Sequence, residues 1–128
     1  MGPSIGLRGQ ATVRVTEDRT AQALGSGDLA VFATPAMVAL MEAAAVQALS
    51  GSLAEGETTV GTRIEVSPLA PTPVGMEVRA EAELTAVEGR KLIFTIVAHD
   101  QQQKIVEGLH QRIIVARDRF LAKPARGN

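Results

Sequence analysis

Hydrophobic residues follow two different periods along this chain. Residues 34–49 (TPAMVALMEAAAVQAL) are apolar on every side of a helical projection. A helix of this kind in a globular protein is buried, so the segment predicts one long internal helix. From Thr58 onward the apolar residues instead alternate with polar ones, as they do in β-strands that have one face on a core. Strand-like runs span residues 7–16, 58–67, 76–84, 92–99 and 105–116, and the run 92–99 is apolar on both faces, as a covered central strand would be.

The ends of the predicted helix carry recognisable signals. Thr34 is suited to cap its N-terminus, because the hydroxyl can accept a hydrogen bond from a free amide of the first turn. Pro35 suits the first helical position, and Gly51 can end the helix. At about 1.5 Å per residue the helix is roughly 24 Å long, which is too short to span a bilayer.

The connections complete the predicted fold. Residues 17–31 mix polar and small side chains and predict a loop with one helical turn, while the three prolines of 68–75 favour a sheet edge or a connection. One strand, a long helix and four antiparallel strands indicate an α+β fold, in which a curved antiparallel sheet wraps around the helix. We expect a single domain over residues 1–118 and a loose tail over residues 119–128.

Composition narrows the classes of function. The chain has 128 residues with three Phe and no Trp or Tyr, so its core consists of small aliphatic side chains that allow a helix to approach a sheet closely. The net charge is −1 without a basic run, which argues against a nucleic-acid partner. The absence of cysteine removes disulfides, thiolate nucleophiles and thiolate metal ligands. We see no signal segment or membrane span, and we expect a cytoplasmic protein.

Elimination leaves few candidates for chemistry. No glycine-rich phosphate loop is present, and the serines lack a nucleophile-elbow context. His99 and His110 lie eleven residues apart without a carboxylate pattern between them, so we expect no metal site. Glu42 is the one charged residue of the buried helix, where a carboxylate is costly unless it is paired or used. The remaining candidates are Thr34, Glu42, Gly61, Thr62, His110 and Arg112.

Each candidate has a structural alternative. Thr34 can be a helix cap or a catalytic hydroxyl, next to helix amides that suit an oxyanion. Glu42 can form an ion pair with Arg63 or Arg112, or act as the general base for a water molecule. The glycine at 61 can form a β-bulge, and the histidine at 110 can be an ordinary satisfied strand residue.

Seven segments, in order, resemble the fluoroacetyl-CoA thioesterase-like branch of the hot-dog superfamily. They cover roughly residues 31–115 and are VFATPAMVALME (31–42), EGE (55–57), VGT (60–62), TP-x-G (72–75), TAVEGRKL with AHD (85–92 and 98–100) and G-x-H-x-R (108–112). The resemblance implies a hot-dog fold and a homodimer that binds an acyl-CoA thioester at the subunit interface. It implies no cofactor, because the CoA thioester is the substrate.

The resemblance also implies roles for particular residues. A Thr at the helix N-terminus, a helix Glu and a His from the following strand carry hydrolysis in that family. The first two correspond to Thr34 and Glu42, and the third corresponds to Pro68. The family's glycine, whose backbone lies against the acyl group, corresponds to Gly61. We expect Gly61, Thr62 and Arg112 to bind the substrate, with Arg112 either orienting Glu42 or meeting the ligand from the partner subunit.

Three functions follow from these observations. An acyl-CoA thioesterase would use Glu42 to activate water or to form an anhydride. Thr34 would polarise or position the carbonyl, and amides near Gly61 would bind the oxyanion. Pro68 at the family's histidine position favours an alternative, a protein that binds an acyl-CoA or another small thioester without turnover. A hot-dog hydratase would need an Asp–His pair near the helix, and Asp28 has no histidine near it in the sequence.

Overall fold

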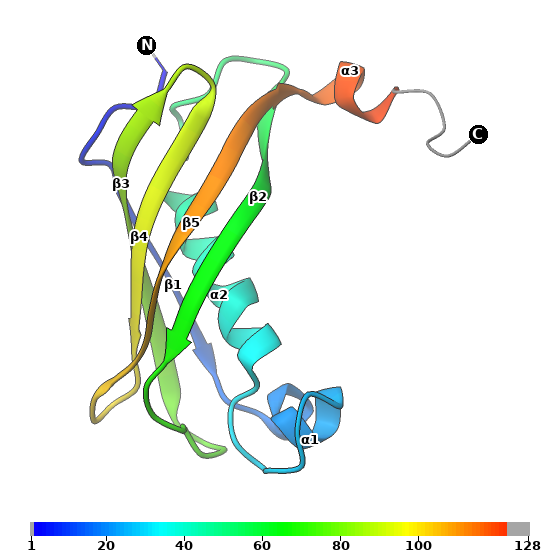
Figure 1. Cartoon of the computed structure of the whole chain (residues 1–128), viewed down its shortest axis with the longest axis vertical. Coiled ribbons are helices and arrows are strands. Elements are labelled where there is room, and N and C mark those ends of the chain that lie inside the picture. Colours follow the sequence, from blue (N-terminus) through cyan, green and yellow to red (C-terminus); the bar gives the residue numbers. More distant parts are fainter. Residues whose placement is uncertain (1, 123–128) are drawn as a thin grey trace.

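The computed structural model describes residues 2–122, in which a five-stranded antiparallel sheet curls around one long helix (Figure 1). The strands have the order β1-β3-β4-β5-β2, so β1 and β2 form the two edges. This is the hot-dog arrangement that the sequence predicts. The elements are β1 (Arg8–Arg14), η1 (Glu17–Arg19), α1 (Ala21–Leu24), α2 (Thr34–Ala48), β2 (Glu57–Pro68), β3 (Glu77–Glu88), β4 (Lys91–His99), β5 (Lys104–Ala116) and α3 (Arg117–Leu121).

The core lies between the inner face of the sheet and one side of α2. The helix packs mainly against β1 and β3, while β2 and β5 curl past its other side (Figure 1). Phe94 and Met41 are among the largest fully buried side chains, and most of the remaining core is Ala, Val, Leu and Ile. The curled sheet nevertheless leaves one face of the helix uncovered.

The expected burial of α2 on every face is wrong for the single chain. Ala39, Ala43 and Val46 are exposed and follow one another along one face of the helix. The opposite face, with Leu40, Ala44 and Ala48 among others, is buried. The apolar character all around the helix therefore leaves a stripe of small, apolar side chains that this chain does not cover.

The start of α2 also differs in detail from the expectation. Ala33 is the N-cap and Thr34 is the first helical residue, so Pro35 takes the second position. No side chain caps this end, and Thr34 is exposed. The predicted capping role of Thr34 is therefore wrong. Thr34 already belongs to the helix, and its hydroxyl does not accept a hydrogen bond from the first-turn amides.

The C-terminal segment begins as a helix. Residues 119–121, which we expected to belong to a loose tail, form part of α3, and residues 123–128 lie outside the described part of the chain. Among residues 2–122, no helix combines the length and the apolar character needed to cross a membrane.

Candidate active site

Glu42 reaches from α2 toward the inner face of β2 and β5. Its carboxylate Oε2 lies 3.7 Å from the guanidinium Nη1 of Arg112 on β5. The Arg112 side chain is 9% exposed, whereas that of Glu42 is 41% exposed. The sequence left Arg63 and Arg112 as possible partners, and Arg63 forms an ion pair with Glu65 instead. Glu42 is thus held by a buried cation on one side and is open on the other.

Arg112 is fixed by Thr59 on the neighbouring strand β2. Its Nε donates a hydrogen bond to Thr59 Oγ1 at 2.8 Å, and its second terminal nitrogen donates to the Thr59 carbonyl at 3.1 Å. Burial lowers the pKa of Arg112 from its ordinary value, and the Glu42 carboxylate opposes that shift. The guanidinium nevertheless remains charged at neutral pH, because its pKa starts far above that range. The hydrogen bonds to Thr59 hold the Arg112 guanidinium in place, so that it can orient the Glu42 carboxylate.

His110 is satisfied at both ring nitrogens. Nδ1 lies 2.8 Å from the Arg63 carbonyl oxygen, which can only accept, so Nδ1 carries the proton. Nε2 then accepts a hydrogen bond from Arg112 Nη1 at 3.0 Å. Burial lowers the pKa of His110, and the positive charge of Arg112 adds to this shift against the opposing effects of the Arg63 carbonyl and Glu42. His110 is therefore a neutral residue that orients Arg112.

This arrangement predicts a pH-dependent stability. Because the folded-state pKa of His110 is lowered, the unfolded chain binds a proton more readily than the folded chain, so stability is complete above about pH 6.5 and falls as the pH drops below that value. We expect the urea midpoint to fall between pH 6.5 and 5, and to fall less in His110→Gln, which cannot titrate. Equal pH dependence in both proteins would contradict the assigned neutral state.

Gly61 on β2 leaves the space that this cluster occupies. A Cβ at this position would lie 3.0 Å from Glu42 Oε2, 3.1 Å from His110 Cε1 and 3.3 Å from Arg112 Nη1. Three of the residues singled out in the sequence therefore converge on the backbone of a fourth. Any side chain at position 61 would therefore press on the Glu42 carboxylate and its partners.

Thr62 lies on the other face of the sheet. The pairing of β2 with β5 shifts between Gly61 and Arg63, so Thr62 is the extra residue of a bulge. Its hydroxyl contacts the Gln111 carbonyl at 3.3 Å, and it lines an outer groove of about 650 Å³ with Arg90 and Phe120. The side chain of Thr62 is therefore not joined to the group around Glu42.

Thr34 is also separate from this group within one chain. It lies eight residues before Glu42, about 12 Å along the helix axis. Thr59, by contrast, belongs to the group and was missed in the sequence. The signal that could have found it is its position two residues before Gly61, which places both residues on the same face of β2.

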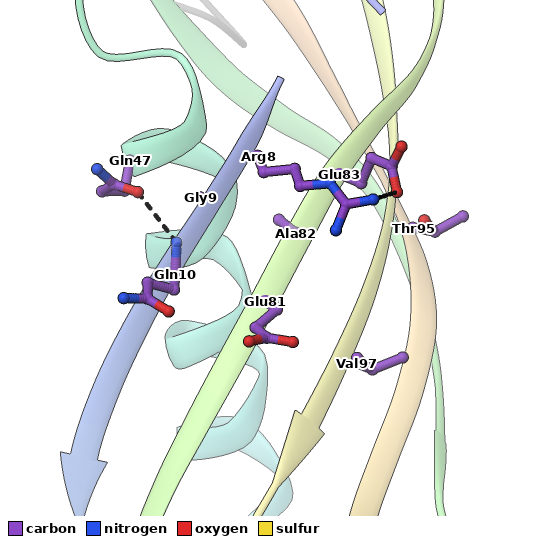
Figure 2. Close-up of a pocket in the computed structure, with 9 residues that line it drawn as sticks. All are labelled: Arg8, Gly9, Gln10, Gln47, Glu81, Ala82, Glu83, Thr95 and Val97. Atoms are coloured by element: carbon purple, nitrogen blue, oxygen red, sulfur yellow. Dashed lines mark hydrogen bonds and ion pairs between the residues drawn. The ribbon is translucent and has the colours of Figure 1, made fainter. Parts of the chain in front are cut away.

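A second hollow lies over the outer face of β1, β3 and β4 (Figure 2). It measures about 540 Å³, and its charged side chains include Arg8, Glu81 and Glu83. Arg8 is paired with Glu83 at 3.3 Å, and Gln47 Oε1 accepts a hydrogen bond from the Gln10 amide at 3.0 Å (Figure 2). None of the candidate site residues lines this hollow. Within residues 2–122, no three His, Asp or Glu side chains gather in a way that could hold a metal ion.

Comparisons with known proteins agree with one another. The family model for fluoroacetyl-CoA-specific thioesterases matches residues 15–118. A fluoroacetyl-CoA thioesterase of Streptantibioticus cattleyicolor is 45% identical over 93 residues, which make up 73% of this chain and 67% of that protein. The solved structure of the fluoroacetyl-CoA thioesterase FlK has a TM-score of 0.88 at 37% identity, with 96% of each chain covered. A threonine-to-serine variant of FlK in complex with acetyl-CoA has a TM-score of 0.89 at 36% identity, with 94% of this chain and 96% of that chain covered.

Proposed function

The chain belongs to the fluoroacetyl-CoA-specific thioesterase family, and we propose that it hydrolyses a small acyl-CoA thioester. The observation that carries this proposal is the carboxylate of Glu42, which is held 3.7 Å from a buried arginine and lies against the backbone of Gly61. A carboxylate that is oriented on one side and open on the other is suited to accept a proton from water.

The reaction needs only water as co-substrate. Glu42 takes a proton from a water molecule whose oxygen attacks the thioester carbonyl carbon. The tetrahedral intermediate then collapses, the carbon–sulfur bond breaks, and the CoA thiolate receives the proton, so that a carboxylic acid and CoA are released. Arg112 keeps the Glu42 carboxylate aimed at the water, and the missing side chain at Gly61 leaves room for the Glu42, His110 and Arg112 side chains.

Thr34 has a separate role in this proposal. It opens the first turn of α2, where free backbone amides and the positive end of the helix dipole favour a developing oxyanion. Because Thr34 and Glu42 are about 12 Å apart along the axis, they would contact a bound thioester from different sides. Thr34 would therefore position the carbonyl while Glu42 activates the water.

We further propose that the active form is a homodimer. Three features remain uncovered in one chain: the Glu42 carboxylate, the stripe of Ala39, Ala43 and Val46, and the outer edge of β2. Exposed sheet edges and apolar patches are commonly covered by a partner. A second copy placed on this side would enclose Glu42 and exclude bulk water from the site.

The dimer is expected to be stable at micromolar concentration. Light scattering should give the mass of two chains, and Val46→Glu, which places a charge in the apolar stripe, should reduce it to the mass of one. The exposed substitution Glu83→Gln, on the outer face of β3, should leave the dimer intact. A monomeric wild-type protein would overturn the proposed assembly.

The proposed activity is tested by thiol release from a panel of short, branched and aromatic acyl-CoA esters. The panel includes fluoroacetyl-CoA because the names of the matching family and of the relative identify it as their substrate. We expect catalytic release of CoA from at least one member of the panel. Absence of release from every ester would overturn the proposal.

One observation favours a second candidate function. Pro68, which corresponds to the family's histidine, ends β2 and cannot transfer a proton. His110 does not replace that histidine, because both of its ring nitrogens are already bonded. A protein that binds acyl-CoA without hydrolysing it would have the same fold and the same open carboxylate.

A further inference from the structure

The segment that leads into α2 is held by two backbone hydrogen bonds. The Phe32 amide donates to the Thr72 carbonyl at 2.8 Å, and the Ala33 amide donates to the Arg19 carbonyl at 2.9 Å. These residues immediately precede Thr34. The position of the first turn of α2 relative to the sheet therefore depends on where Thr72 and Arg19 lie.

Thr72 is itself fixed from a distant part of the chain. It is 0% exposed, and its hydroxyl donates a hydrogen bond to Asp100 Oδ2 at 3.0 Å. Asp100 follows β4, in the turn that connects it to β5. The other carboxylate oxygen of Asp100 accepts from the amides of Gln102 and Gln103 at 2.8 and 2.9 Å. One carboxylate thus joins the β4–β5 turn to the loop that supports the start of α2.

The chemistry of Asp100 makes this connection rigid. Burial alone raises the pKa of its carboxyl, but the hydrogen bonds from Gln102, Gln103 and Thr72, with His99 nearby, together hold that pKa below its ordinary value. Asp100 is therefore ionised at neutral pH. Hydrogen bonds to an ionised acceptor are stronger than those between neutral groups, and both oxygens are engaged.

We propose that Asp100 is a positioning residue for the reaction, which acts through Thr72 to set the place of Thr34 and the first-turn amides of α2. This inference rests on the proposed thioesterase function, because it assigns Asp100 an effect on a step that Thr34 serves. Asp100 has no contact with the group around Glu42, which is fixed separately by Arg112. Glu42 and Thr34 are thus held by two separate hydrogen-bond networks. The network around Glu42 lies on the inner face of β5, and the network that supports Thr34 lies at the β4–β5 turn.

Substitutions at Thr72 test the inference with little change in volume. Thr72→Val keeps the shape of the side chain but removes the hydroxyl that bonds to Asp100, whereas Thr72→Ser keeps the hydroxyl. We expect Thr72→Val to lower kcat about tenfold with a smaller change in KM, since small displacements of a positioning group reduce rate steeply. Thr72→Ser should retain most of the wild-type kcat.

A double-mutant cycle separates positioning from general loss of stability. In a Thr34→Ala background, Thr72→Val should lower kcat by about threefold or less, because the Thr34 hydroxyl is already missing and only the displacement of the first-turn amides remains. If Thr72→Val costs the same factor in both backgrounds, Asp100 does not act through Thr34 and the inference is wrong. Full activity of Thr72→Val in the wild-type background would overturn it as well.

Hydrogen exchange provides a readout that does not depend on turnover. In Thr72→Val, the amides of Phe32 and Ala33 should exchange at least tenfold faster than in Thr72→Ser, while amides in the middle of β5 should be unchanged. If the wild-type protein fails to hydrolyse any ester, the proposed function fails, and this comparison still decides whether Asp100 fixes the start of α2. Equal protection of Phe32 and Ala33 in both variants would show that it does not.

Discussion

Glu42→Gln is expected to abolish most thioester hydrolysis. The substitution keeps the size of the side chain and an oxygen that can face Arg112, but the amide cannot accept a proton from water. Loss of a general base lowers rates by about 10²- to 10⁴-fold, so kcat should fall by at least 10² while KM changes little. The measurement is CoA release from the best ester of the panel, with circular dichroism to confirm that the variant is folded.

A matched substitution controls for the loss of one negative charge. Glu83 lies on the outer face of β3 and pairs with Arg8 at 3.3 Å, away from the group around Glu42. Glu83→Gln should therefore keep the wild-type kcat. If Glu42→Gln keeps more than about a tenth of the wild-type kcat, Glu42 is not the general base.

Gly9→Ala is expected to destabilise the fold strongly. Gly9 on β1 is buried against α2, and a Cβ at this position would lie 2.3 Å from the Ala48 amide nitrogen and 2.4 Å from the Ala44 carbonyl oxygen. Both contacts are with the helix backbone, which cannot rotate away as a side chain can. The helix would have to move away from β1, and overpacking of this kind costs about 3 kcal/mol. The melting temperature should then fall by roughly 10 °C.

Gly27→Ala serves as the control for that substitution. A Cβ at Gly27 would meet only the Ala21 Cβ, at 3.3 Å, and Gly27 is exposed. The change should therefore alter the free energy of unfolding by less than about 1 kcal/mol. If thermal unfolding gave Gly9→Ala the same stability as Gly27→Ala, the close contact between α2 and β1 would be wrong.

The elements of the fold were largely predictable because each has a local signal. The expected helix over 34–49 is α2 at Thr34–Ala48, since its apolar run is interrupted at Ser50 and Gly51. Strands were found from their period of two, except that residues 92–99 were found from an apolar run between two turns. The small aliphatic composition also predicted a close approach of helix and sheet, which is observed where Gly9 meets α2.

The site was predictable only where its residues follow that local pattern. The alternation placed Val60, Thr62, Ile64 and Val66 on one face, but the bulge after Gly61 reverses the faces. Ile64 therefore packs against the core, while Thr62 points outward. A single inserted residue exchanges the two faces of a strand, and its position depends on pairing with β5 rather than on nearby sequence.

Contacts between distant segments could not be read from the sequence. Two arginines could have paired with Glu42, and only the fold brings Arg112 to it while Arg63 pairs with Glu65. The bond from Thr72 to Asp100 likewise depends on how a loop packs against a turn that lies 28 positions away. Such contacts are set by the packing of the whole chain, and no periodic pattern in the sequence indicates them.

The most direct test of the proposed function is a single-turnover reaction. The best ester of the panel is mixed with an excess of wild-type protein, the reaction is stopped at intervals, and intact ester and free acid are quantified by mass spectrometry. Excess protein ensures that even slow chemistry on the bound ester is detected. The thioesterase account predicts that all bound ester is converted to acid and CoA. Bound ester that remains intact would contradict it and would identify a protein that binds acyl-CoA without hydrolysing it.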